Sequence, residues 1–186
     1  MSQIILARHA KVKIDNPLIY SSQMQKWIET YNYAPIDETE ISHELQVLVE
    51  NADILLTSKL SRTNETLKVF GKEPNYSHVI FNEAELPYSD LTLFRMPAKF
   101  WTVFFRAAWL LGYRSNSESY TEAKIRAGVA VDKLIEFSKQ HKTVLLVGHG
   151  VMNRLIIKAL QKRGVVLKEK TGDGNLSYSV LEATKN

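Results

Sequence analysis

The sequence predicts an α/β fold: a three-layer α/β/α sandwich with a mostly parallel central sheet and a helical cap insertion. Short apolar runs within 4–10, 53–58 and 143–147 are typical of strands that are buried on both faces of a parallel sheet. Longer segments with apolar residues at helical spacing separate these runs. Strands that alternate with helices favour parallel pairing through helical crossovers.

The composition is that of an ordinary globular protein. At 186 residues, with 45% hydrophobic and 24% charged residues, the chain is expected to form a single domain over residues 1–186. The absence of cysteine excludes disulfides, thiolate metal ligands and a cysteine nucleophile. None of the five histidines has the i, i+4 partner of a helical zinc motif. We therefore expect no metal and no other cofactor.

The charge and the apolar segments indicate the class of partner. The net charge of +4 mildly favours an anion, but we expect it to be spread along the chain, which argues against nucleic acid. The N-terminus lacks a signal-peptide pattern, and the apolar region at 100–112 is too short to span a bilayer. These features predict a cytoplasmic protein with a small-molecule partner and no membrane partner, and they indicate no particular oligomeric state.

The first half of the chain alternates between strand and helix signals. Pro17 suits the first position of a helix, and the residues after it carry apolar side chains at roughly helical spacing. Gly71 and then Pro74 are typical of a helix end. The expected elements are a strand at 4–7, a helix opened by Pro17, a helix at 41–51, a strand at 53–58, a helix ended by Gly71, and a short strand at 79–81.

The second half begins with an aromatic-rich segment at about 88–120, the expected cap insertion. Either it forms a pair of helices that pack in the core, or it covers a pocket whose basic residues select an anionic substrate; a membrane-surface helix is a third interpretation. The basic residues are Arg95, Lys99, Arg106 and Arg114. The elements expected after it are an amphipathic helix at 119–140, a strand at 143–147, a helix at 151–161, a basic loop at 164–174 and a last strand at 176–181.

Polar side chains follow the expected strands at the point where each strand ends. The first strand runs into Arg8 and His9, the second is followed by Arg62, and the strand at 143–147 leads into Gly148-His149-Gly150. Parallel strands place their carboxyl ends at one edge of the sheet, where ligands bind in open α/β folds. Clustered arginines and imidazoles repel one another unless an anion lies between them, and arginine forks match phosphate oxygens. The pattern predicts a site for a dianion such as a phosphoryl group.

The same stretches resemble the motifs of a known family. Leu6-Ala7-Arg8-His9-Ala10, Ser58-Lys59-Leu60-Ser61-Arg62 with Glu65-Thr66 after it, and Val147-Gly148-His149-Gly150 stand in the order of the histidine phosphatase superfamily, the phosphoglycerate mutase-like proteins. The resemblance covers nearly the whole chain. It departs from the family's Arg-His-Gly signature at Ala10. The family's asparagine after that signature falls on Asp15 without a gap or on Asn16 with one. A carboxylate facing phosphate would be repulsive, so only Asn16 is a candidate.

The resemblance implies catalytic roles for four of these residues. His9 is the nucleophile that becomes a phosphohistidine. Arg8, Arg62 and His149 hold the phosphoryl oxygens and offset charge in the transition state.

A carboxylic acid in this family protonates the leaving group. Glu83 and Glu85 both follow the expected strand at 79–81, and alternation would point them to the same side. We choose Glu83, because Phe81-Asn82-Glu83 resembles the family's pattern and Glu85 precedes Leu86-Pro87, where the chain is expected to turn.

The resemblance implies a metal-independent phosphatase that hydrolyses a small phosphomonoester. A phosphomutase of the same chemistry is the first alternative, although mutases of this family usually have longer chains. A catalytically silent protein that binds a phospho-ligand is the second, because a fold alone does not establish function.

Overall fold

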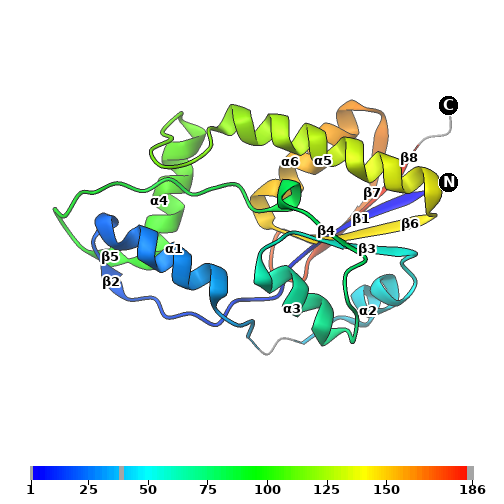
Figure 1. Ribbon diagram of the computed structural model, residues 1–186, viewed down its shortest axis with the longest axis horizontal. Coiled ribbons are helices and arrows are strands. Elements are labelled where there is room, and N and C mark those ends of the chain that lie inside the picture. Colours follow the sequence, from blue (N-terminus) through cyan, green and yellow to red (C-terminus); the bar gives the residue numbers. More distant parts are fainter. Residues whose placement is uncertain (1, 38–39, 184–186) are drawn as a thin grey trace.

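The structure, a computed structural model, describes residues 2–37 and 40–183 (Figure 1). Its centre is a six-stranded sheet in the order β4-β3-β6-β1-β8-β7. The four parallel strands are β1 (Gln3–Arg8), β3 (Ile54–Thr57), β4 (Tyr76–Ser77) and β6 (Thr143–Gly148). Two antiparallel strands, β7 (Val165–Lys170) and β8 (Tyr178–Ala183), extend the sheet beside β1. The predicted mostly parallel α/β sheet is confirmed.

Helices cover both faces of this sheet, as Figure 1 shows. α5 (Tyr120–Gln140) and α6 (Gly150–Lys162) pack on the face that receives Ile4 and Leu6 of β1. α2 (His43–Glu50) and α3 (Ser61–Val69) pack on the face that receives Ile5 and Ala7. Successive side chains of a strand point to opposite faces, so a strand between two helical layers must be apolar at every position. This requirement explains the continuous apolar run at the start of the chain.

A third hydrophobic cluster lies away from the sheet. It joins β2 (Leu18–Ile19), the 3₁₀ helix η1 (Ser21–Gln23) and α1 (Met24–Tyr33) to β5 (Met96–Pro97) and α4 (Ala98–Leu110). We call this cluster the cap cluster; its buried residues are Ile19, Met24, Ala98, Trp101 and Phe105. The segment 88–120 therefore packs against 18–28, and it contains one α-helix before α5 rather than a pair.

Two predicted elements in the first half of the chain are wrong. The helix expected to open at Pro17 begins at Met24, because residues 18–19 pair with β5 and η1 intervenes. The strand expected at 79–81 is the 3₁₀ helix η2 (Val79–Phe81), and the edge strand is β4. β4 ends beside Thr57, the last residue of β3, so residues 79–81 have no strand to pair with.

The basic loop expected at 164–174 is also wrong. Residues 165–170 form β7, an edge strand that pairs with β8. Lysine and glutamate side chains are common on edge strands because they discourage further pairing, and here they conceal the strand pattern.

Candidate active site

The carboxyl ends of β1, β3 and β6 meet at one edge of the sheet, as the sequence predicts. Arg8 pairs with Gly148, and Thr57 pairs with Val147, so the residues that follow each strand are brought together. The rings of His9 and His149 lie 5.1 Å apart between centroids. Both histidines are buried.

The His9 ring is held with one nitrogen free to react. Nδ1 lies 2.6 Å from the carbonyl oxygen of Ala10, and because a carbonyl only accepts, Nδ1 carries the proton and donates it. Nε2 then has the lone pair. Burial, followed by the positive charge of Arg62, lowers the pKa of His9 from 6.5 to about 3. The imidazole is neutral at neutral pH, which is the state a nucleophile requires.

Alanine fits where the family signature has glycine. The backbone N–H of Ala10 donates to Thr66 Oγ1 at 2.9 Å, and Ala10 is not among the described residues with positive φ. The position therefore does not demand glycine.

His149 is fixed through contacts on either side of β6. Its Nε2 lies 2.8 Å from Ser58 Oγ, the first residue after β3. Asn153 accepts a hydrogen bond from the His149 backbone N–H and donates to the carbonyl of Ala7, so it links the ends of β6 and β1. A Cβ at Gly148 would collide with Asn153 Oδ1, so a larger residue here would displace the Asn153 amide from these two hydrogen bonds. Burial, and then the charge of Arg62, lowers the pKa of His149 well below its ordinary value.

Arg62 lies in the first turn of α3 and is held by α1. One guanidinium nitrogen donates to Asn32 Oδ1 at 2.9 Å, and the Tyr31 ring lies 4.9 Å from the guanidinium carbon. Arg8 donates to the carbonyl oxygen of Asp173. Its guanidinium lies so close to the start of α6 that a Cβ at Gly150 would come within 3.2 Å of it.

Unpartnered nitrogens gather in this cluster. Four buried side-chain polar atoms lack a hydrogen-bond partner in the part of the chain that the structure describes. Three of them are Arg8 Nε, Arg62 Nε and His149 Nδ1. A buried polar group without a partner costs free energy, so such a concentration favours a ligand with several acceptor oxygens.

Glu83 joins the site from the segment after η2. Its carboxylate accepts hydrogen bonds from the backbone N–H groups of Val151 and Met152 at the N-terminus of α6. Its negative charge acts on the Arg62 guanidinium. Burial lowers the pKa of Arg62, and the nearby Tyr31 and Glu83 partly offset this effect by raising it. The Glu85 carboxylate instead accepts from the Glu118 backbone N–H.

Two arginines hold the segment that carries Glu83. Arg126 of α5 donates to the carbonyl oxygens of Ile80, Asn82 and Glu83 and pairs with the Glu118 carboxylate. Arg106 of α4 donates to the carbonyl oxygens of Ala84 and Glu85. One interpretation of the sequence counts Arg106 among four basic residues that select an anionic substrate, but the structure directs its guanidinium to the backbone.

Asn16 lies at the N-terminus of α4, and Asp15 contacts α1. Asn16 Oδ1 accepts from the Lys99 backbone N–H, and the Asp15 carbonyl accepts from Trp27 Nε1. The structure does not bring Asn16 into the cluster around His9.

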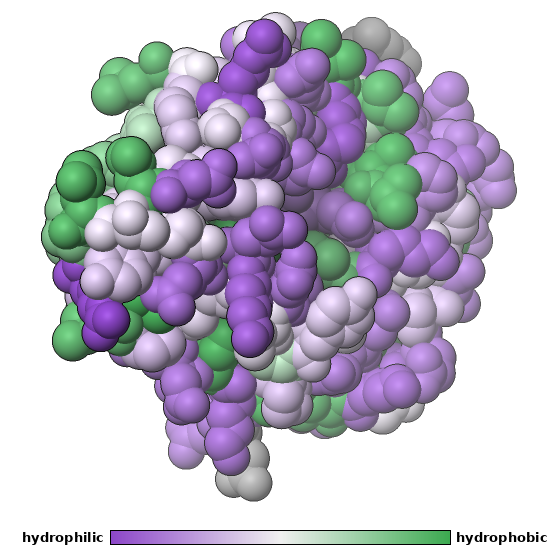
Figure 2. All heavy atoms as spheres, turned by 60° about the vertical axis from the view of Figure 1, so that its left-hand side comes forward, coloured by the Kyte–Doolittle hydropathy of each residue, from purple (hydrophilic) through white to green (hydrophobic). Residues whose placement is uncertain are grey.

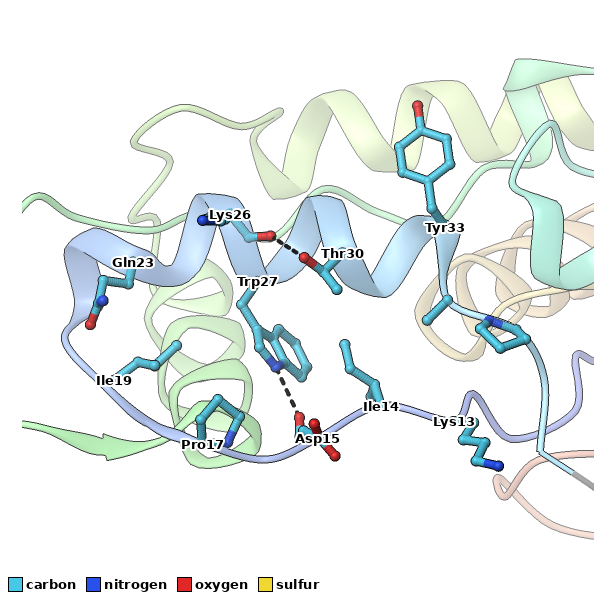
Figure 3. A pocket seen from close by; sticks show the side chains of 12 residues that line it. Lys13, Ile14, Asp15, Pro17, Ile19, Gln23, Lys26, Trp27, Thr30 and Tyr33 are labelled. Atoms are coloured by element: carbon cyan, nitrogen blue, oxygen red, sulfur yellow. Dashed lines mark hydrogen bonds between the residues drawn. The ribbon is translucent and has the colours of Figure 1, made fainter.

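A cavity beside α1 is a separate feature. It measures about 690 Å³ and lies between the segment 13–19 and α1; Figure 3 shows the Trp27 ring pointing into it. None of His9, Arg62, Glu83 and His149 lines it. Within 2–37 and 40–183, no three histidine, aspartate or glutamate side chains cluster as a metal site requires.

Three residues of the site were missed in the sequence. Asn32 reaches Arg62 from α1, Asn153 links two strand ends, and Arg126 holds the Glu83 segment. Only Asn153 had a usable signal, because it lies one helical turn after His149 in a helix that starts at the site.

Comparison with known proteins identifies the family. The profile of the histidine phosphatase superfamily (branch 1) matches residues 4–186. No curated protein matches the sequence. Similar solved structures show the same fold. The protein of open reading frame Rv3214 from Mycobacterium tuberculosis is 18% identical, with a TM-score of 0.61 over 96% of this chain and 90% of that one.

Two further structures are similar to this chain. A mycobacterial glucosyl-3-phosphoglycerate phosphatase is 17% identical, with a TM-score of 0.57 over 97% of this chain and 89% of that one. The phosphoserine phosphatase of Entamoeba histolytica is 14% identical, with a TM-score of 0.54 over 97% and 90%. With a family profile that matches nearly its whole length, this chain belongs to the histidine phosphatase superfamily.

Proposed function

We propose that this protein is a metal-independent phosphatase that hydrolyses a small phosphomonoester through a phosphohistidine on His9. The observation that carries the proposal is the set of three unpartnered nitrogens, on Arg8, Arg62 and His149, gathered with a neutral imidazole. Phosphoryl oxygens are the acceptors that such a set fits. The names of two similar structures, a glucosyl-3-phosphoglycerate phosphatase and a phosphoserine phosphatase, are consistent with this substrate class.

The proposed reaction has two steps. The lone pair of His9 Nε2 attacks phosphorus, the P–O ester bond breaks, and the carboxyl group of Glu83 gives its proton to the leaving oxygen. Water then attacks the phosphohistidine, Glu83 takes a proton from that water, and the N–P bond breaks to release phosphate. Arg8 and Arg62 offset the charge on the phosphoryl oxygens in both steps.

Turnover and trapping test this proposal. We expect hydrolysis of p-nitrophenyl phosphate with excess chelator present, and loss of turnover in His9→Ala. Brief mixing with substrate should leave an acid-labile, base-stable phosphoryl group on His9. His43→Ala is the matched control, because this exposed histidine lies at the start of α2. Phosphate found on a serine, or an alanine variant that keeps most of its activity, would remove His9 as nucleophile. Phosphate binding without turnover would identify a silent binding protein instead.

A further inference from the structure

The outward face of α4 is unusually apolar for a surface helix. The inward positions Trp101, Phe105 and Trp109 are buried, as expected for a packed helix. The opposite face, with spacing i, i+3, i+4 and i+10, is exposed: Phe100 (58%), Val103 (67%), Phe104 (51%) and Leu110 (57%). Leu111 (90%), the C-cap residue directly after the helix, extends this face. Figure 2, which brings the α1–α4 end of the molecule forward, shows hydrophobic residues gathered along the left side of the view. Single exposed apolar residues are ordinary, but a contiguous group marks an interaction surface.

The same segment holds the excess positive charge of the chain. Residues 91–117 contain four basic and no acidic residues, and acidic and basic residues are equal in number in the rest of the sequence. The net charge of +4 is therefore concentrated here, and the expectation that it is spread along the chain is wrong. Arg95 and Lys99 are exposed at the N-terminal end of α4; Arg114, beyond its C-terminal end, interacts with Glu122.

We infer that the outward face of α4 docks on an anionic lipid bilayer. A helix with phenylalanine and leucine on one face and lysine or arginine at its margins is typical of helices that lie in the membrane interface. With 13 residues α4 is about 20 Å long, which suits lying in the interface and not crossing it. Among the residues that the structure describes, no helix is long and apolar enough to cross a membrane.

Charge favours lipid over the other occupants. A second copy docked through the same face would bring two copies of 91–117 together, with no carboxylate in either segment to pair with the basic residues. Nucleic acid fits less well, because the face is a convex helix with aliphatic Val103, Leu110 and Leu111 and not a groove with a row of aromatic platforms. Acyl chains match the apolar face of α4, and anionic headgroups match the basic residues at its margins.

Vesicle sedimentation tests the inference on the full chain. We expect the protein to sediment with phosphatidylcholine–phosphatidylserine vesicles, less with phosphatidylcholine alone, and less at high salt. The triple variant Val103→Ser, Leu110→Ser, Leu111→Ser should bind at least about tenfold more weakly. The control triple variant Val69→Ser, Ile125→Ser, Val166→Ser removes exposed apolar residues elsewhere and should bind like the wild type. Unchanged circular dichroism and p-nitrophenyl phosphate turnover verify that the α4 variant is folded.

Four results would overturn the inference. One is no sedimentation with the anionic vesicles, and another is equal sedimentation of the wild type and the α4 variant. The third is a wild type that is dimeric in light scattering and does not bind vesicles, together with an α4 variant that is monomeric. This result would identify a second copy as the occupant. Binding of a single-stranded oligonucleotide in place of vesicles would likewise assign the face to nucleic acid.

Discussion

Arg62 acts electrostatically on both histidines of the candidate site, His9 and His149. Its guanidinium is buried and bonded to Asn32, and one of its nitrogens has no partner. Its charge is the second-largest cause of the lowered pKa values of both His9 and His149. Burial, the largest cause, and this cation together keep both imidazoles neutral, and the unpartnered nitrogen of Arg62 remains as a donor for an anion.

Arg62→Ala should therefore weaken binding of vanadate by about 2–5 kcal/mol, the loss expected when one partner of a buried charged pair is removed. Competitive inhibition of p-nitrophenyl phosphate turnover measures the affinity. Lys68→Ala, an exposed charge on the same helix, is the control and should change little. Equal vanadate affinities in wild type and Arg62→Ala would place Arg62 outside the site.

The lowered pKa of His9 also predicts how stability depends on pH. An unfolded histidine takes up a proton near pH 6.5, whereas folded His9 does so only at about pH 3. The contribution of His9 to the free energy of unfolding is therefore fully present above about pH 6.5. It decreases by about 1.4 kcal/mol per pH unit as the pH falls toward about 3. His149, whose pKa is lowered in the same direction, adds to the slope.

Urea unfolding at about pH 7 and about pH 5 measures this slope. His9→Asn should lose less stability between the two conditions than the wild type, and His43→Asn, at an exposed site, should follow the wild type. If all three proteins lose the same free energy, His9 does not carry a lowered pKa.

At the scale of elements, burial decided what could be predicted. β1, β3 and β6 are buried on both faces, so their apolar runs were visible in the sequence, and so were the residues at their ends. β7 was hidden because its exposed positions carry lysine and glutamate. Asn32 and Arg126 were hidden for another reason: each reaches the site from a distant helix, and a polar residue on a helix is normally expected to face solvent.

The contacts of the segment after η2 distinguish the two candidate acids, Glu83 and Glu85. Glu83 reaches the start of α6 beside the cluster, whereas the Glu85 carboxylate is bonded to the Glu118 backbone. Glu83→Gln should slow hydrolysis of alkyl phosphates by about 10²–10⁴. It should slow p-nitrophenyl phosphate much less, because nitrophenolate leaves without a proton.

The two substrates provide an internal control for this prediction. A general disturbance of the α6 N-terminus would slow both alike, and only loss of the acid would slow the alkyl ester selectively. Glu85→Gln should change neither rate greatly. The opposite pattern, with Glu85→Gln selective for alkyl phosphates, would move the role to Glu85.

At the scale of the whole molecule, the hydrophobic residues are divided unequally. The two large clusters lie on the faces of the sheet, and the cap cluster buries only five residues. It is joined to the sheet layers by the packing of α1 on α3 and by Trp109 of α4, which belongs to the cluster on the α5–α6 face. Asn32 of α1 accepts from Arg62 and from the Ser61 hydroxyl, so the cap cluster meets the candidate site at α3. A small cluster with few links is expected to open at a lower free energy than the sheet.

Native-state hydrogen exchange should therefore show amides of α4 opening at a lower free energy than those of β1 and β6. Trp101→Ala removes a side chain that is 4% exposed, and it should lower the α4 opening energy by about 3–5 kcal/mol, or to zero if less is available, while the β6 amides change little. Leu134→Ala, in the cluster packed on the sheet, is the matched control and should lower the protection of the sheet. If α4 and β6 exchange at one common free energy, and Trp101→Ala lowers both together, the cap cluster and the sheet unfold as one cooperative unit and this division is wrong.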